Sequence, residues 1–313
     1  MKPLHCLPLI TPLVLAGCAT TYHAGAPKGA IQVIAHRGAS AYAPENTLAA
    51  FERAIALHAD WFELDCHLTK DGEVMVMHNG DVDKTTNGQG RIADMTLAEL
   101  KALDAGSWFA PEFAEEPVPT LGEALDLAKE RIGVYVEIKD AGDAGAVAGR
   151  LSHAAGEHTV LTRGLRRELM AAIEKSGTRN LELTRKTIAA IRERRMKDQV
   201  VIQSFSSVVC FIALCEAPEL RTEFLGSDDK EKPQHWSQFL ETGYLMDVAG
   251  FNVHHESLSE ERLANFHRAR KTAAVWTVDE EPLLRRYAQW GVDAIITNKP
   301  DVALEVLEKA GKR

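Results

Sequence analysis

Short apolar segments alternate with helical patterns along most of this 313-residue chain, and this alternation restricts its fold more than any other feature. The clearest strand candidates are 31–35, 61–68, 133–138, 200–203, 273–277 and 293–297, and weaker ones are 221–225 and 247–253. Strands that alternate with helices form parallel sheets, because each helix returns the chain to the same edge. About eight such units in a chain of this length predict an α/β fold of the closed (β/α)8 barrel type.

Two stretches depart from a simple repeat of one strand and one helix. An extended segment at 73–77 follows the second strand candidate after a turn at 69–72. The stretch 141–198 is helical and charged, and it is long for one crossover of a barrel, so we expect it to hold an extra helix. The main alternative fold is a doubly wound sheet, but the chain has no glycine-rich phosphate loop.

The first 30 residues have the pattern of a targeting segment and a linker. Residues 7–15 are mostly apolar, too short to span a bilayer permanently, and typical of a signal peptide. They lead into Leu15-Ala16-Gly17-Cys18, which resembles the cleavage site of a bacterial lipoprotein. We therefore expect a lipoprotein signal peptide at 1–17 and a linker at 18–30 that begins with a lipidated Cys18. The alternative is a plain secretory signal with a chance cysteine.

A lipid on Cys18 would tether an otherwise soluble domain to a membrane. Ala19 follows the cysteine, and by resemblance to the sorting rules of Gram-negative bacteria a residue other than Asp indicates the outer membrane. The expected location is therefore the cell envelope, at the outer membrane facing the periplasm or at the cell surface.

The net charge limits the kinds of partner that the chain can bind, and the cysteine count bears on disulfide formation. The formal net charge of −9 argues against a nucleic-acid partner, because phosphate backbones need a basic face. It does not exclude a phosphate substrate, since a metal ion and an arginine can reverse the sign locally. Beyond Cys18 the chain has only Cys66, Cys210 and Cys215, an odd number that does not indicate a disulfide framework. Nothing in the sequence indicates an oligomeric state.

Acidic side chains gather toward the ends of two successive strand candidates. Glu63 and Asp65 are two residues apart on a strand, so both leave the same face. Glu137 ends the next barrel strand and can join them, because active sites of such barrels lie at the carboxyl ends of the strands. A solvated strand edge is the alternative, but Phe62 and Leu64 are apolar. Three carboxylates without cysteine favour Mg²⁺ or Ca²⁺ over zinc.

Basic and imidazole side chains occupy the same predicted edge. Arg37 and Lys139 supply positive charge for a phosphate group, or else they form salt bridges to the carboxylates of a metal-free site. His36 and His78 can share the roles of general base and general acid. This combination indicates metal-assisted phosphoryl transfer.

Other residues of the predicted rim carry weaker signals. Gln203 and Trp276 lie near the ends of their strand candidates, and we expect both to contact the substrate. For Trp276, packing inside the barrel explains the residue as well as a wall against an alkyl or glycerol group does. His67 shares the face of the acidic pair and is a candidate for an extra ligand, whereas the pair His254-His255 fits no usual ligand spacing.

In this order, the motifs resemble those of the glycerophosphodiester phosphodiesterases, from residue 33 to residue 301. The resemblance rests on His36-Arg37-Gly38 with Pro44-Glu45-Asn46-Thr47, Glu63-Leu64-Asp65 with Leu68-Thr69-Lys70-Asp71-Gly72, His78, Pro119-Thr120-Leu121, Val136-Glu137-Ile138-Lys139, Gln203-Ser204-Phe205, Trp276-Thr277-Val278 and Gly291-Val292-Asp293-Ala294-Ile295-Ile296-Thr297. Each motif alone is weak, but the ordered set is specific.

The resemblance implies a TIM barrel, (β/α)8, over 31–313 with a small insertion after the second strand, here at about 79–119. It implies hydrolysis of glycerophosphodiesters, such as glycerophosphocholine or glycerophosphoethanolamine, to glycerol 3-phosphate and an alcohol. The implied cofactor is one divalent cation, Mg²⁺ or Ca²⁺. The nucleophile is either water or the glycerol 2-hydroxyl.

The resemblance also implies a role for each site residue. Glu63, Asp65 and Glu137 would bind the cation, and Arg37 and Lys139 would hold the phosphate. His36 and His78 would act as the general acid and general base.

Three positions depart from the usual family pattern. Asn79 follows His78 where Asp is often found, Asp279 stands where Asn is frequent, and Asn298 stands where Asp is frequent. Two other functions remain open. One is a phospholipase D-like or lyase activity on lysophospholipid or sphingolipid, which would need an apolar channel. The other is a non-catalytic surface lipoprotein that binds ligands, which would be expected to lose site residues, and none is missing.

Overall fold

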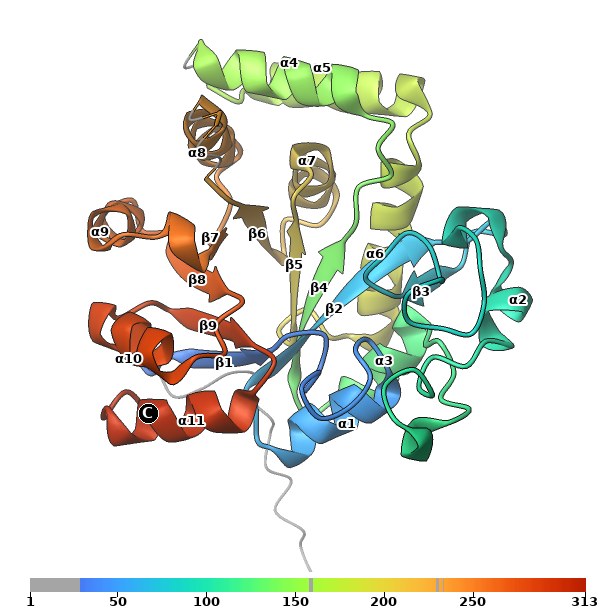
Figure 1. Ribbon diagram of the computed structural model, residues 1–313. Helices are drawn as coiled ribbons and strands as arrows, with labels where there is room; N and C mark the ends of the chain where they lie inside the picture. Colours follow the sequence, from blue (N-terminus) through green and yellow to red (C-terminus); the bar gives the residue numbers. More distant parts are fainter. Residues whose placement is uncertain (1–28, 158–159, 229–230, 233) are drawn as a thin grey trace, which may run out of the picture.

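The chain forms a closed barrel of parallel strands (Figure 1). The computed structural model describes residues 29–157, 160–228, 231–232 and 234–313. Its nine-stranded sheet has the order β1-β9-β8-β7-β6-β5-β4-β2-β3, and β1 also pairs with β2. That pairing closes every strand except β3 into the barrel, which confirms the predicted (β/α)8 fold. The expected signal peptide, Cys18 and most of the linker lie outside the described residues.

The barrel strands lie where the apolar segments predict them, within three residues at each end. They are β1 (Gln32–Ala35), β2 (Trp61–Leu68), β4 (Gly133–Ile138), β5 (Val200–Ser204), β6 (Arg221–Gly226), β7 (Gly250–His254), β8 (Thr272–Trp276) and β9 (Ala294–Thr297). The extended segment after β2 is β3 (Val74–Val76), which pairs antiparallel with β2.

Helices surround the barrel (Figure 1). The ring consists of α1 (Leu48–Ala56), α3 (Leu121–Ala128), α6 (Arg179–Arg194), α7 (Ser207–Glu216), α8 (Gln234–Met246), α9 (Glu260–Arg268), α10 (Glu281–Trp290) and α11 (Pro300–Lys309). Several begin at a residue whose side chain caps the first backbone N–H groups. Thr120 and Glu123, for example, form a reciprocal capping box at the start of α3.

The long stretch 141–198 holds more than the one extra helix expected from the sequence. It contains α4 (Gly145–Gly156) and α5 (Arg163–Ser176) before the ring helix α6. These two helices pack on α7 and α8, outside the ring (Figure 1). Among the described residues, no helix is both long and apolar enough to cross a membrane.

The segment 79–119 connects β3 to α3 and has its own small core. It holds η1 (Ile92–Asp94), α2 (Leu97–Lys101) and η2 (Pro111–Phe113). Met75 and Met77 at β3 pack with Ile92 and Leu100 of the segment. This core fixes the segment beside the carboxyl ends of β2 and β4, where the acidic residues lie.

The strand alternation separates the barrel interior from the layer beneath the helices. On β2, Phe62 and Leu64 face outward, and Phe62 stacks on Phe51 of α1 with ring centroids 4.3 Å apart. Glu63 and Asp65 face inward because successive side chains of a strand point to opposite sides. The inner apolar cluster, which fills the barrel below them, consists of Ile34, Tyr135, Val201, Ala274, Ala294 and Ile296.

Candidate active site

Three carboxylates converge at the carboxyl ends of β2 and β4. The parallel register sets Asp65 beside Glu137, and Glu63 lies one inward position earlier on β2. One carboxylate oxygen from each of the three residues lies within 4.8 Å of those of the other two. All three side chains are buried, with exposed fractions of 2%, 1% and 7% for Glu63, Asp65 and Glu137. The structure thus brings together the three residues predicted as metal ligands.

The crowding of these carboxylates perturbs their proton affinity. Burial, together with the charges of Asp65 and Glu137, raises the pKa of Glu63 well above its ordinary value. Burial and Asp65 raise the pKa of Glu137 to about 7. Asp65 is also buried, but Lys139 and Arg37 outweigh that effect and lower its pKa. Such a buried, oxygen-rich cluster is suited to a hard divalent cation, which would let all three groups ionise.

The two predicted phosphate-binding cations lie against these carboxylates. Lys139 Nζ is 2.8 Å from Asp65 Oδ1 and 2.6 Å from Glu137 Oε1. Arg37 Nε is 3.5 Å from Asp65 Oδ2, and the Arg37 guanidinium also donates to Glu45 at 2.9 Å. Both cations are therefore held at the rim by ion pairs, which is the alternative that the sequence leaves open for a metal-free site.

The loop after β1 is folded tightly around the acidic cluster. Arg37 has a left-handed backbone with φ of 55°, and its N–H donates to Glu63 Oε2 at 2.9 Å. Gly38 follows with φ of 81°, and a Cβ atom there would lie 2.6 Å from Ala50 of α1. Only glycine fits such a position without displacing the helix. The His36-Arg37-Gly38 motif thus serves a turn as well as chemistry.

Each predicted catalytic histidine is oriented by an amide oxygen. The Nδ1 atom of His36 is 2.8 Å from Asn298 Oδ1, and the Nδ1 atom of His78 is 2.9 Å from Asn79 Oδ1. Burial and the charge of Arg37 lower the pKa of His36 to about 4. Burial also lowers the pKa of His78, with Asp65 acting in the opposite direction.

The remaining rim candidates divide into two groups. His67 is not part of the acidic cluster among the described residues, and its Nε2 atom instead lies 3.1 Å from the His78 carbonyl oxygen. Gln203 is buried at the end of β5, where its Oε1 atom accepts a hydrogen bond from Asn252 at 2.7 Å. Trp276 packs edge-to-face on the exposed Phe205 and on His254, with ring centroids 5.5 Å and 5.1 Å away.

The sequence model of the Glycerophosphoryl diester phosphodiesterase family matches residues 36–170 and 167–302, which include every one of these site residues. The chain belongs to this family. It is 34% identical over 280 residues to a glycerophosphodiester phosphodiesterase of Caldanaerobacter subterraneus, covering 89% of this chain and 98% of that protein. A Bacillus subtilis glycerophosphodiester phosphodiesterase is 31% identical over 280 residues, covering 87% and 85%.

Solved structures of phosphodiesterases have the same architecture. A phosphodiesterase of Oleispira antarctica, solved in complex with the product sn-glycerol-3-phosphate, superposes with a TM-score of 0.71. The match covers 89% of this chain and 97% of that one, at 25% identity. The enzyme from Agrobacterium tumefaciens matches with a TM-score of 0.64 at 26% identity, covering 88% and 99%.

Some residues that shape the family site were not singled out from the sequence. Asn46 donates to Asp65 Oδ2 at 2.8 Å, and its Oδ1 atom accepts the Asp65 N–H at 3.2 Å. Asp279 accepts from the side chain and the backbone N–H of Asn298, at 2.6 and 2.7 Å. The only available signals were the Pro44-Glu45-Asn46-Thr47 motif and the departures at 279 and 298, and neither shows a contact.

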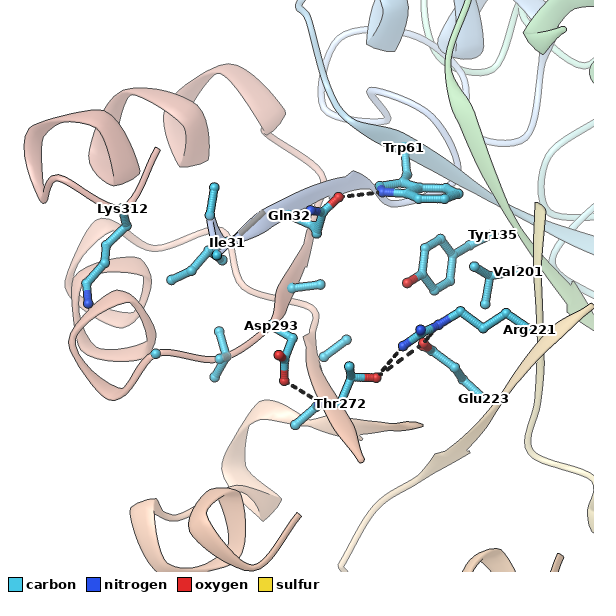
Figure 2. A pocket seen from close by; sticks show the side chains of 17 residues that line it. Ile31, Gln32, Trp61, Tyr135, Val201, Arg221, Glu223, Thr272, Asp293 and Lys312 are labelled. Atoms are coloured by element: carbon cyan, nitrogen blue, oxygen red, sulfur yellow. Dashed lines mark hydrogen bonds and ion pairs between the residues drawn. The ribbon is translucent and has the colours of Figure 1, made fainter. Parts of the chain in front are cut away.

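A cavity of about 500 Å³ lies at the opposite end of the barrel, away from the acidic cluster (Figure 2). Its lining includes the first residues of several strands, among them Gln32, Trp61 and Thr272. Arg221 and the buried Glu223, both on β6, form an ion pair at one wall of the cavity, at 2.6 Å. None of the predicted site residues lines this cavity.

Proposed function

We propose that this chain hydrolyses glycerophosphodiesters to glycerol 3-phosphate and an alcohol, in a reaction that depends on a divalent cation. The observation that carries the proposal is the cluster of Glu63, Asp65 and Glu137 with carboxylate oxygens within 4.8 Å of one another. Beside it stand two fixed cations and two oriented histidines. The substrate class follows from membership of the family and from its glycerophosphodiester phosphodiesterase relatives.

The three carboxylates fit Mg²⁺ or Ca²⁺, since these cations prefer oxygen ligands and tolerate several carboxylates. The chemistry that such a cation supplies when bound is withdrawal of charge from the phosphoryl oxygens. In this proposal Arg37 and Lys139 bind the remaining phosphate charge. The planar guanidinium of Arg37 can donate two hydrogen bonds at once to phosphate oxygens.

His36 and His78 move the protons in the proposed reaction. One imidazole takes the proton of the attacking hydroxyl, from water or from the glycerol 2-hydroxyl, and the other gives a proton to the leaving alkoxide. Both rings have Nδ1 engaged by an amide oxygen, so each has Nε2 left for proton exchange. Trp276 and Phe205 form an aromatic wall at the same rim, suited to the carbon atoms of the glycerol or head group.

The test is an assay of glycerol 3-phosphate release by the purified full chain in mild detergent. Glycerophosphocholine and glycerophosphoethanolamine are supplied, EDTA is added, and Mg²⁺ or Ca²⁺ is then restored separately. We expect release that EDTA stops, that one cation restores, and that Glu63→Gln and His36→Ala abolish. If neither cation supports release from any glycerophosphodiester, the proposal is wrong, and lysophospholipid would be the next substrate to assay.

We also propose that Cys18 carries a lipid and anchors the barrel at the outer membrane, facing the periplasm or the cell surface. The support is the Leu15-Ala16-Gly17-Cys18 motif and the Ala19 that follows it. Mass spectrometry of the amino-terminal peptide from membrane fractions should find an acylated Cys18. The Cys18→Ser variant should lose acylation and leave the membrane fraction, while an unmodified Cys18 in the wild-type protein would refute the anchor.

A further inference from the structure

Three separate segments of the chain meet around the side chain of Asn298, which lies beside the ring of His36. The His36 Nδ1 atom, just after β1, lies 2.8 Å from Oδ1 of Asn298, just after β9. The hydroxyl of Ser40 donates to the same Asn298 oxygen at 2.8 Å. Asp279, which follows β8 in the chain, contacts the other side of the Asn298 amide.

The carboxylate of Asp279 settles which way the Asn298 amide faces. The Asn298 Nδ2 atom donates to Asp279 Oδ2 at 2.6 Å, and the Asn298 N–H donates to Asp279 Oδ1 at 2.7 Å. Thr297 Oγ1 also donates to Asp279 Oδ1, at 2.9 Å. A carboxylate accepts hydrogen bonds and an amide nitrogen only donates them. The Asn298 oxygen must therefore face His36.

An oxygen acceptor at Nδ1 selects one form of the neutral imidazole. The Asn298 oxygen can only accept, so the proton of the ring must reside on Nδ1, which leaves the lone pair on Nε2. We propose that Asp279 and Asn298 are positioning residues that hold His36 in the Nδ1–H tautomer, with Nε2 free to exchange the proton during phosphodiester hydrolysis. The role of His36 in proton exchange rests on the proposed function, whereas the tautomer of its ring does not.

The tautomer matters because His36 is neutral at pH 7. Burial and Arg37 lower its pKa to about 4, against the opposing charges of Asp65 and Glu45 and the hydrogen bond that the ring donates to Asn298. A neutral imidazole in the other tautomer would present an N–H at Nε2 and could not accept a proton there. If the His36 ring rotates or the Asn298 amide reverses, activity therefore falls, even though these contacts lie away from the phosphate.

Exchanging the side chains of Asp279 and Asn298 distinguishes a role in positioning His36 from a purely structural role. In Asp279→Asn the amide of Asn298 is free to reverse and offer its NH₂ to the ring, so we expect kcat to fall at least about tenfold with little change in KM. In the double variant Asp279→Asn/Asn298→Asp, the amide at 279 donates to a carboxylate at 298, which again accepts from His36. We expect kcat to recover most of the loss, with the acidic limb of the pH profile moved upward.

NMR of the ring nitrogens in ¹⁵N-histidine-labelled protein reports the tautomer independently of catalytic activity. The His36 signals are assigned by comparison with His36→Gln. The wild type should show Nδ1–H at pH 7, Asp279→Asn should shift toward Nε2–H, and the double variant should return to Nδ1–H. Asp301→Asn is the matched control, since Asp301 accepts from Tyr42 at 2.8 Å and is not one of the groups that contact Asn298 or His36 among the described residues. It should change neither the spectrum nor kcat.

Two results would overturn the proposal. One is a wild-type His36 with its proton on Nε2. The other is an Asp279→Asn variant that keeps both the tautomer and kcat. Absence of activity in the wild type would refute the proposed function, whereas the tautomer measured in the same protein would still decide this inference.

Discussion

The two ends of the barrel both bury acidic side chains, but they balance them differently. At the carboxyl end, Glu63, Asp65 and Glu137 are contacted by two cationic side chains, and two of the three carboxyl groups have raised pKa values. At the amino end, Glu223 has Arg221 at 2.6 Å, and Arg221 donates further to Thr272 at 2.6 Å (Figure 2).

The difference separates a site suited to chemistry from a structural contact. A buried carboxylate with its own cation has no further need of a partner, whereas crowded carboxylates store unfavourable energy that a divalent cation would relieve. Burial and charge alone do not distinguish the two ends. The ratio of carboxylates to cations does.

The largest difference should appear in catalysis. Glu63→Gln keeps the shape of the side chain but removes one of the three carboxylates, so we expect kcat/KM to fall about 10³-fold or more, the scale of lost electrostatic stabilisation. Glu223→Gln at the other end should keep kcat/KM within about threefold. The measurement is glycerol 3-phosphate release at saturating cation. Equal losses in the two variants would remove the distinction between the ends.

Stability in the absence of metal should show the reverse order. Arg221→Ala leaves the buried Glu223 without its ion pair, and we expect it to cost about 2 kcal/mol of unfolding free energy, less than for a fully buried pair because Arg221 is 43% exposed. Glu63→Gln should cost far less or stabilise, because it relieves repulsion among the carboxylates. Urea unfolding in EDTA measures both. A larger cost for Glu63→Gln than for Arg221→Ala would contradict the comparison.

The stability of the metal-free protein should also depend on pH, because the carboxylates at the rim are crowded. Glu137 has a folded pKa of about 7, above its ordinary value, so its proton stabilises the folded state at low pH. That contribution is complete below the ordinary pKa and is lost as the pH rises through about 7. We expect roughly 2 kcal/mol of stability to disappear between pH 5 and pH 8 in EDTA.

Thermal unfolding from pH 5 to pH 8, with and without Mg²⁺ or Ca²⁺, measures this loss. The cation should stabilise more at pH 8 than at pH 5, because its ligands must be deprotonated. Glu137→Gln should flatten the profile in EDTA. A metal-free protein that gains stability over the same range would show that the carboxylates at the rim are not crowded in solution.

The sequence predicts the fold well because the barrel is made of consecutive local units. Each strand is an apolar run, so β2 and β4 have the predicted bounds at both ends. The inward direction of Glu63 and Asp65 follows from their spacing alone. Their meeting with Glu137 required only that β2 and β4 be neighbours.

The rest of the site depends on contacts that spacing does not encode. Arg221 and Glu223 have the same two-residue spacing as Glu63 and Asp65, yet they line the amino end. Barrel strands are tilted and staggered, so equal positions on two strands lie at different depths. The contact between Asn298 and Asp279 joins two loops whose distance appears only in the folded chain. The sequence marks both positions as departures from the pattern that the resemblance implies, but it does not show that the two side chains touch.

The smallest expected effect concerns the aromatic wall. Phe205 is 48% exposed, follows β5 and packs edge-to-face on Trp276. Its removal in Phe205→Ala should cost about 1 kcal/mol of substrate binding, which is about a fivefold rise in KM, and should leave kcat nearly unchanged. Phe109→Ala is a suitable control, because Phe109 also packs edge-to-face on a tryptophan, Trp108, but in the 79–119 segment. If Phe205→Ala instead lowered kcat without changing KM, the aromatic wall would stabilise the transition state. Its role would then be catalytic, as proposed for the carboxylates, and not one of substrate binding.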